Sequence, residues 1–155
     1  SHFGYNLKAT DMQAAVGCAQ IKKFPSFVVR RKENFARLKE GLLDLQDSFI
    51  LPEPCENSDP CWFGFLITCK EGCDRNKVVR YAEEQGVQTR MLFSGNLTKH
   101  PCFDQMRREG RGYRIAGDLT VTDRIMTDTF WIGVYPGMTD AMIDRMIRVL
   151  KEAVK

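Results

Sequence analysis

The stretch WFGFLIT, residues 62–68, is rich in aromatic and β-branched side chains and predicts a buried strand. After it, Asp74 can cap a helix that runs to Gln85, and Gly86 is a suitable stop because glycine tolerates a positive φ. Residues 87–93 are typical of a second strand. The sequence around WFGFLIT therefore predicts a strand-helix-strand unit.

The C-terminal part of the chain extends this unit. Residues 129–135 predict a third strand, and Thr139 can cap a final helix whose apolar side chains recur at helical spacing up to Val154. Short helices are expected near 101–108 and 122–126. We expect an α+β fold with one face of a short sheet buried by the helices at 74–85 and 139–154.

The N-terminal part predicts two helices. Thr10 and Gln13 form a capping box, and Pro25 suits the first turn of a long amphipathic helix with apolar positions from Val28 to Leu45. The proline-rich residues 51–60 are a loop, so we place a boundary between about 46 and 60. The sheet layer is expected not to need the first fifty residues, and the chain, which opens without a Met, is expected to be a piece of a longer protein.

Composition excludes several classes of protein. The chain of 155 residues has 43% hydrophobic and 28% charged residues, which argues against disorder, and it has no apolar run long enough to span a membrane. A net charge of +3, from 23 basic and 20 acidic residues, is too small and too scattered for a nucleic-acid footprint. Six cysteines without a Cys-x-x-Cys pair, and only two histidines, predict free thiols of a cytoplasmic protein and no metal site.

The residues alone show no catalytic constellation. His2 and His100 have no carboxylate or cysteine partner that is evident from the sequence, and there is no glycine-rich phosphate loop. From residue chemistry alone, the function stays undetermined.

Four segments carry a family resemblance. They are GYNLKATDMQAAVG at 4–17, TRMLFSGNLT at 89–98, GDLT at 117–120 and DTFWIGVYPG at 128–137. Together they resemble the DegT/DnrJ/EryC1/StrS family of pyridoxal-phosphate-dependent sugar aminotransferases, and within it the branch of CDP-4-keto-6-deoxyglucose 3-dehydrases. The resemblance implies the C-terminal third of a fold-type I transferase: residues 1–48 would end the large cofactor domain and form a linking helix, and residues 49–155 would form the small α+β domain with a mainly antiparallel sheet.

The resemblance also implies a reaction. A 3-dehydrase uses pyridoxal or pyridoxamine 5'-phosphate to remove the C3 hydroxyl of a nucleotide-linked 4-keto-6-deoxy sugar for the O-antigen of lipopolysaccharide, with electrons from a reductase partner. The parent would be a homodimer, and its catalytic residue would precede Ser1, a lysine in aminotransferases and a histidine base in dehydrases. A [2Fe-2S] cluster of the parent would also be held upstream, so none of the six cysteines is expected to bind it.

Four residues inherit candidate roles from the family pattern. Asn6 matches the asparagine that reaches the cofactor phosphate of the other subunit, and Lys8 stands where many relatives have an arginine near the nucleotide diphosphate. Arg90 and His100 are candidates for substrate contact, although a solvated arginine fits the same sequence. Thr98 replaces the histidine of many sugar aminotransferases, which favours the dehydrase branch.

Two other functions remain open at this point. A sugar aminotransferase would differ at a catalytic residue outside the sequence, and a non-catalytic interaction module could keep the fold without the chemistry. Residues 1–155 alone are expected to be inactive, to bind the cofactor weakly, and to associate through the small residues at 14–19 and the apolar stripe at 28–45.

Overall fold

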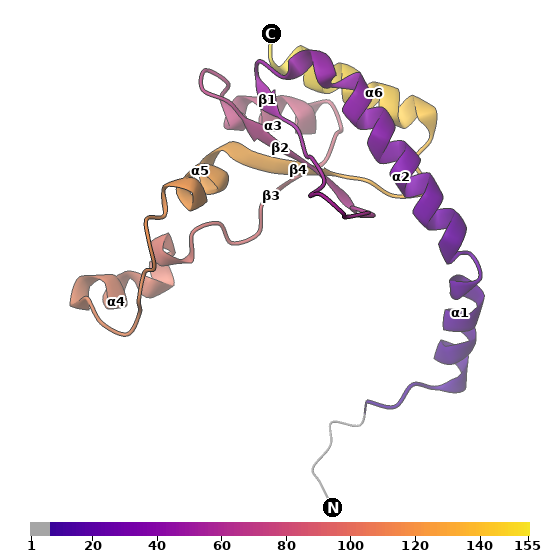
Figure 1. Cartoon of the computed structure of the whole chain (residues 1–155), viewed down its shortest axis with the longest axis horizontal. Helices are drawn as coiled ribbons and strands as arrows, with labels where there is room; N and C mark the ends of the chain where they lie inside the picture. The colour runs from indigo at the N-terminus through magenta and orange to yellow at the C-terminus, as the bar shows by residue number, and fades with distance from the viewer. Residues whose placement is uncertain (1–6) are drawn as a thin grey trace, which may run out of the picture.

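A four-stranded sheet in the order β1-β2-β4-β3 is the centre of the computed structural model, which describes residues 7–155 (Figure 1). The stretch WFGFLIT forms β2 (Gly64–Cys69), which pairs with β1 (Phe49–Ile50) and β4 (Thr129–Gly133). On the other side of β4 lies β3 (Thr89–Met91). All three pairings are antiparallel, as the fold class implied.

One face of the sheet is covered by α3 (Arg75–Glu84) and α6 (Asp140–Ala153), which confirms the predicted layer (Figure 1). Side chains alternate along β2, so that Phe65 and Ile67 are fully buried under these helices while Leu66 faces the opposite side. The buried apolar core consists of Leu38, Leu42, Phe49, Leu51, Phe65, Ile67, Cys69, Val78, Ala82, Val87, Phe130, Ile132, Val134, Met138, Ile143, Val149 and Leu150.

The covering helices begin and end where the sequence predicts. The Asp74 carboxylate accepts a hydrogen bond of 2.9 Å from the backbone N–H of Asn76, and Gly86, just after α3, has a φ of 77°. At α6, the Thr139 hydroxyl accepts from the backbone N–H of Met142 at 3.3 Å. These caps satisfy N–H groups that a helix leaves unpaired at its start.

Two helices precede the sheet. α1 (Asp11–Ile21) begins at the predicted capping box, in which the Gln13 side chain accepts a 2.9 Å hydrogen bond from the backbone N–H of Thr10. α2 (Phe24–Gly41) has Pro25 in its first turn and is followed by the 3-10 turn η1 (Leu43–Leu45). No residue of α1 is buried within the part of the chain that the structure describes.

The C-terminal half of α2 belongs to the core of the sheet layer. Leu38 and Leu42 are both 0% exposed, and the buried Asn34 amide donates a 2.9 Å hydrogen bond to the carbonyl oxygen of Tyr135. The expectation that the layer does not need the first fifty residues is therefore wrong, because apolar side chains of α2 fill space beside α6. A division at residue 48 stays a prediction.

Ion pairs join the solvent-facing edges of α2 and α6. Asp140 accepts from Arg30 at 2.9 Å and from Arg37 at 2.8 Å, and Arg37 also pairs with Asp144 at 2.7 Å. The hydrogen bond from Arg30 and then that from Arg37 hold the pKa of the Asp140 carboxyl below its ordinary value. The charged form of Asp140 is thus favoured by folding.

We expect Asp140→Asn to lower the free energy of unfolding at pH 7, with a deficit that shrinks as the pH falls. A carboxyl whose pKa is depressed by folding stabilises the fold above its unfolded pKa of about 3.9, and this stabilisation is lost as pH falls through the folded pKa. Urea unfolding of both proteins between pH 7 and pH 3 measures the difference. Asp47→Asn, at an exposed aspartate before β1, is the control. A deficit that is the same at pH 3 and pH 7 would contradict this role of the Asp140 charge.

Between β3 and β4 the chain leaves the sheet and forms an arm, residues 92–119, that carries three short elements. These are η2 (Leu97–Lys99), η3 (Pro101–Phe103) and α4 (Asp104–Glu109), so the helix predicted near 101–108 is split in two. The arm returns through α5 (Thr120–Asp128), which is longer than the predicted 122–126.

A polar anchor fixes the arm to α5. The Asn96 side chain is 2% exposed, and its amide donates a 2.7 Å hydrogen bond to Asp123, which also pairs with Lys99 at 2.7 Å. The hydroxyl of Thr98 donates to the side-chain oxygen of Asn96 at 2.6 Å. A buried amide with partners on both ends fixes the local backbone, because leaving either end unpaired is costly.

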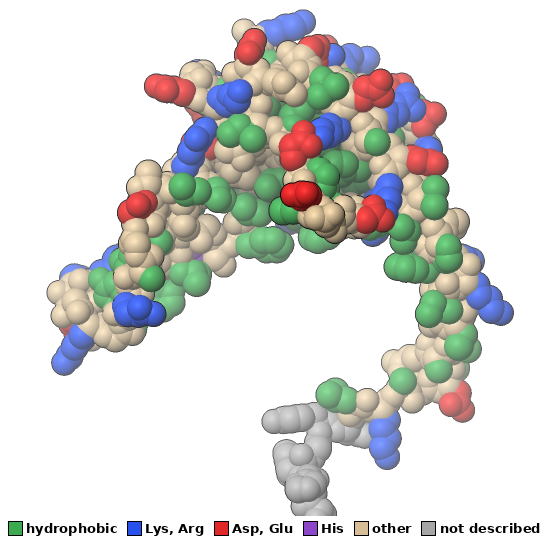
Figure 2. All heavy atoms as spheres, viewed as in Figure 1, with side chains coloured by type: hydrophobic (Ala, Val, Ile, Leu, Met, Phe, Trp, Pro, Cys, Tyr) green, Lys and Arg blue, Asp and Glu red, His purple; other side chains and the backbone are tan. Residues whose placement is uncertain are grey.

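The molecule has the outline of an arch, with α1 at one end, α4 at the other and the sheet at its crown (Figures 1 and 2). Figure 2 shows hydrophobic side chains gathered on the concave side, below the sheet. Among residues 7–155, no helix combines the length and apolar character that crossing a bilayer requires.

The cysteines are all free thiols, and their burial differs. We expect Cys18, Cys55 and Cys102, which are exposed, to react rapidly with iodoacetamide at neutral pH, and the buried Cys69 to react only after unfolding. Burial raises the pKa of Cys69, and it also raises the pKa of Cys73, which further lowers the thiolate fraction. Pulsed alkylation and peptide mass spectrometry measure the rates; labelling of Cys69 as fast as Cys55 in the native protein would contradict the fold.

Candidate functional site

Two cavities meet at Trp131, one on the face of the sheet that α3 and α6 leave open and the other between the β3 end of the sheet and α6. The aromatic cavity, of about 440 Å³, is lined by Trp62, Phe63, Leu66, Phe93 and Trp131, with Glu53 among its polar residues. The arginine cavity, of about 520 Å³, is lined by Arg90, Tyr135, Met142, Arg145 and Met146, and again by Trp131. Trp131 is therefore the wall that the two cavities share.

The Trp131 ring lies across the sheet. Its indole N–H donates a 3.2 Å hydrogen bond to the carbonyl oxygen of Met91 on the neighbouring strand. On the other side, a Cβ added to Gly64 would lie 2.8 Å from Cε3 of the ring, so the ring packs directly on the glycine backbone. The Phe63 ring stands at 89° to it, with a centroid separation of 5.4 Å. Phe63 and Trp131 thus form an aromatic corner.

Arg90 is placed beside this corner by the register of the sheet. It lies opposite Trp131 in the pairing of β3 with β4, so the two side chains share one face of the sheet. Arg90 is exposed and lines the arginine cavity, as does Arg145, which donates a 2.6 Å hydrogen bond from α6 to the carbonyl oxygen of Gln85. Two guanidinium groups at one cavity are suited to an anion.

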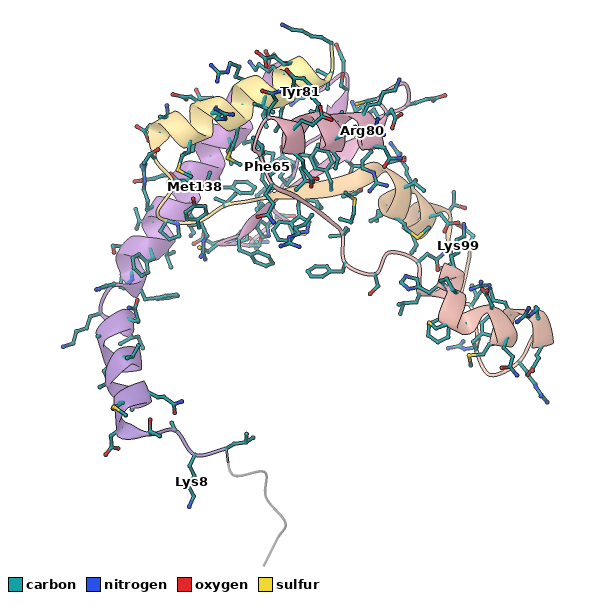
Figure 3. All side chains as sticks on the ribbon, turned by 180° about the vertical axis from the view of Figure 1, so that it is seen from behind. Lys8, Phe65, Arg80, Tyr81, Lys99 and Met138 are labelled. Carbon is teal, nitrogen blue, oxygen red and sulfur yellow. The ribbon has the colours of Figure 1, made fainter. Side chains whose placement is uncertain are left out.

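The other predicted site residues are not brought to these cavities. His100 lies in the arm, where its Nε2 is 2.5 Å from the carbonyl oxygen of Ser94; because that oxygen only accepts, Nε2 carries the proton. Lys8 is exposed ahead of α1, and Figure 3 shows it at the opposite end of the arch from Lys99, the neighbour of His100. Asn6 lies outside the described residues.

Sequence reasoning missed Trp131, Phe63 and Arg145. Trp131 and Phe63 each belong to a strand-forming run, and the small Gly64 and the large Trp131 become neighbours on one face only through the pairing of β2 with β4. Arg145 gives no signal in the sequence, because its approach to the β3 end depends on how α6 packs.

A coenzyme site is not complete within residues 7–155. Neither cavity is lined by a lysine or a histidine, so neither offers an amine for a covalent bond to an aldehyde nor an imidazole base. Lys39 pairs at 2.6 Å with Glu53, which lines the aromatic cavity, but is not itself a lining residue. The described donor set therefore does not by itself fit pyridoxal phosphate.

Two named proteins are similar to this chain over almost its whole length. The chain is 49% identical over 154 residues to the lipopolysaccharide biosynthesis protein RfbH of Salmonella typhimurium, covering 98% of this chain and 34% of that protein. It is 46% identical over 156 residues to the dTDP-4-dehydro-2,6-dideoxy-D-glucose 3-dehydratase of Saccharopolyspora spinosa, covering 99% of this chain and 32% of that protein. The chain thus spans about a third of the length of these relatives.

A solved structure has the same fold. It is the E. coli GDP-4-keto-6-deoxy-D-mannose-3-dehydratase with bound hydrated pyridoxal phosphate, which aligns with a TM-score of 0.77 at 23% identity over 95% of this chain and 36% of the other. The family model that describes the DegT/DnrJ/EryC1/StrS aminotransferases matches residues 1–151. The chain therefore belongs to the DegT/DnrJ/EryC1/StrS aminotransferase family.

Proposed function

We propose that the protein to which this chain belongs is a nucleotide-sugar 3-dehydratase that depends on pyridoxal or pyridoxamine phosphate. The observation that carries this proposal is 46% identity, over 99% of the chain, to a protein named as a sugar 3-dehydratase. Thr98, at the position of the histidine of many sugar aminotransferases, supports the same choice. The substrate would be a nucleotide-linked 4-keto-6-deoxy sugar used for lipopolysaccharide.

When bound, the coenzyme supplies the electron-withdrawing group that makes loss of the C3 hydroxyl feasible. The catalytic base would come from the part of the polypeptide upstream of Ser1. This chain would contribute Asn6 to the coenzyme phosphate across a homodimer, and Lys8, Arg90 and His100 to the substrate. Figure 3 shows Lys8 far from Lys99, the neighbour of His100, and this separation supports contributions of Lys8 and His100 to different parts of the complex, or to different subunits.

The proposal extends to the setting of the reaction. A reductase partner would supply the electrons that the net removal of a hydroxyl requires, and the reaction would take place in the cytoplasm, where nucleotide sugars are made. A [2Fe-2S] cluster would be held upstream of this chain, as the family resemblance implies. Residues 1–155 alone would be inactive.

The experiment that tests the proposal uses the full-length protein. It is purified, loaded with pyridoxal phosphate, reduced with borohydride and analysed by mass spectrometry for a coenzyme adduct on lysine, with iron and acid-labile sulfide measured in parallel. We expect no lysine adduct, because a histidine base cannot form one, together with bound iron and sulfide. A stoichiometric lysine adduct would overturn the proposal and identify a sugar aminotransferase.

A further inference from the structure

We propose that Trp131 is a stacking platform for the base of a nucleoside diphosphate, whose phosphates reach Arg90. The inference rests on the proposed function, because it assigns the nucleotide part of the sugar-nucleotide substrate to a place on this chain. It goes further by naming Trp131 as the stacking platform, Phe63 as a second aromatic contact and Arg90 as the anion contact. Of these three residues, only Arg90 was anticipated from the sequence.

The platform is built by three contacts. The missing side chain at Gly64 lets the Trp131 ring lie against the backbone of β2, and the hydrogen bond from its indole N–H to Met91 holds the far end of the ring over β3. The Phe63 ring lies perpendicular to the indole, with a centroid separation of 5.4 Å. The indole is thereby fixed on the sheet, and it is half-buried and lines both cavities.

This arrangement suits a planar aromatic ligand. Every nucleobase has a π-face that can stack on an exposed aromatic ring, and the perpendicular Phe63 offers a second contact to its edge. The aromatic cavity, at about 440 Å³, has room for a base and a ribose. Glu53 lines the same cavity and can accept hydrogen bonds from base N–H groups.

The anion contact lies on the other side of the same ring. Arg90 is directly opposite Trp131 in the sheet register and lines the arginine cavity, which adjoins the aromatic cavity at Trp131. Arg145 lines the arginine cavity too. A ligand with a flat apolar ring joined to a compact anion matches an aromatic cavity and an arginine cavity side by side, and a nucleoside diphosphate has both parts.

The test is calorimetric titration of the full-length protein with CDP, dTDP and GDP, and then with the matching nucleoside and with pyrophosphate. For the best of the three nucleotides, we expect Trp131→Leu to raise the Kd by about tenfold, which is the effect of losing one base stack. Gly64→Ala, which displaces the ring, is expected to act in the same direction. Arg90→Met should weaken the diphosphate and pyrophosphate by about tenfold and leave the nucleoside unchanged.

One control variant and one further site variant keep the test decisive. Arg80→Met removes an exposed arginine of α3, on the helical side of the sheet (Figure 3), and should leave every Kd unchanged. Phe63→Leu changes a side chain that is 60% exposed, so it probes the aromatic corner in a variant that folds. Nucleotide affinity unchanged in folded Trp131→Leu, Phe63→Leu and Arg90→Met would overturn the inference, and a fall in thermal stability alone would show that this face packs against the rest of the polypeptide instead.

The two proposals fail separately. Nucleotide binding that depends on Trp131 and Arg90 in a protein with a lysine adduct would overturn the dehydratase and leave the platform standing. A protein that forms no lysine adduct, and whose nucleotide affinity is unchanged in the Trp131 and Arg90 variants, would overturn the platform and leave the dehydratase proposal standing.

Discussion

Replacing Phe65 with alanine is expected to lower the free energy of unfolding by about 3 to 5 kcal/mol, a large share of the about 5 to 15 kcal/mol that is ordinary for a folded chain. Phe65 is 0% exposed in β2, lies opposite Ile132 of β4, and its ring centroid is 4.8 Å from that of Phe35 on α2. Figure 3 shows it between the sheet and the helices. The variant leaves a cavity where the two layers meet, and denaturant unfolding followed by circular dichroism measures the loss.

Phe63→Ala is the matched control for this change. Phe63 precedes β2 by one residue and is 60% exposed, so its removal should cost much less than the removal of Phe65. Equal losses for the two variants would contradict the burial of Phe65 between the sheet and the helices.

Leu38→Ala is expected to cost about 2 to 5 kcal/mol, although the residue lies in the linking helix. Leu38 is 0% exposed in α2 and belongs to the same core as Leu150 of α6. If α2 and the sheet layer fold as one unit, the variant should unfold in one transition at a lower denaturant concentration. The slope of the unfolding free energy against denaturant concentration should stay unchanged.

Val29→Ala, at a 56% exposed position earlier in α2, should change stability by much less. A Leu38→Ala protein in which the sheet unfolds at the original midpoint, while helix signal is lost separately, would show that the boundary lies after α2, as the sequence suggested.

Local patterns were sufficient for most of the fold. The aromatic run at β2, the Asp74 cap and Gly86 stop of α3, and the apolar repeat of α6 each act through their own neighbours, so their elements lie within a few residues of the predicted bounds. β1 has only two residues, and what makes it a strand is its pairing with Thr68 and Cys69, which no local pattern shows.

The candidate site was harder to predict for the same physical reason. Arg90 could be anticipated because it belongs to a family motif on a predicted strand. The role of Trp131 depends on Gly64, which is far from it in sequence and becomes its neighbour only through the pairing of β2 with β4. Lys8, Arg90 and His100 were all candidates for substrate contact, but Figure 3 shows Lys8 and Lys99, the neighbour of His100, at opposite ends of the arch.

The most direct test of the proposed dehydratase is the mass of the product. The full-length protein is incubated with pyridoxamine phosphate, a reductase, its electron donor and CDP-4-keto-6-deoxyglucose, and the nucleotide sugar is analysed by high-resolution mass spectrometry. Removal of the C3 hydroxyl with two electrons and two protons releases water and leaves a sugar that has lost one oxygen atom, and this product is the predicted result. A product in which the keto oxygen is replaced by an amine, with the C3 hydroxyl retained, would contradict it.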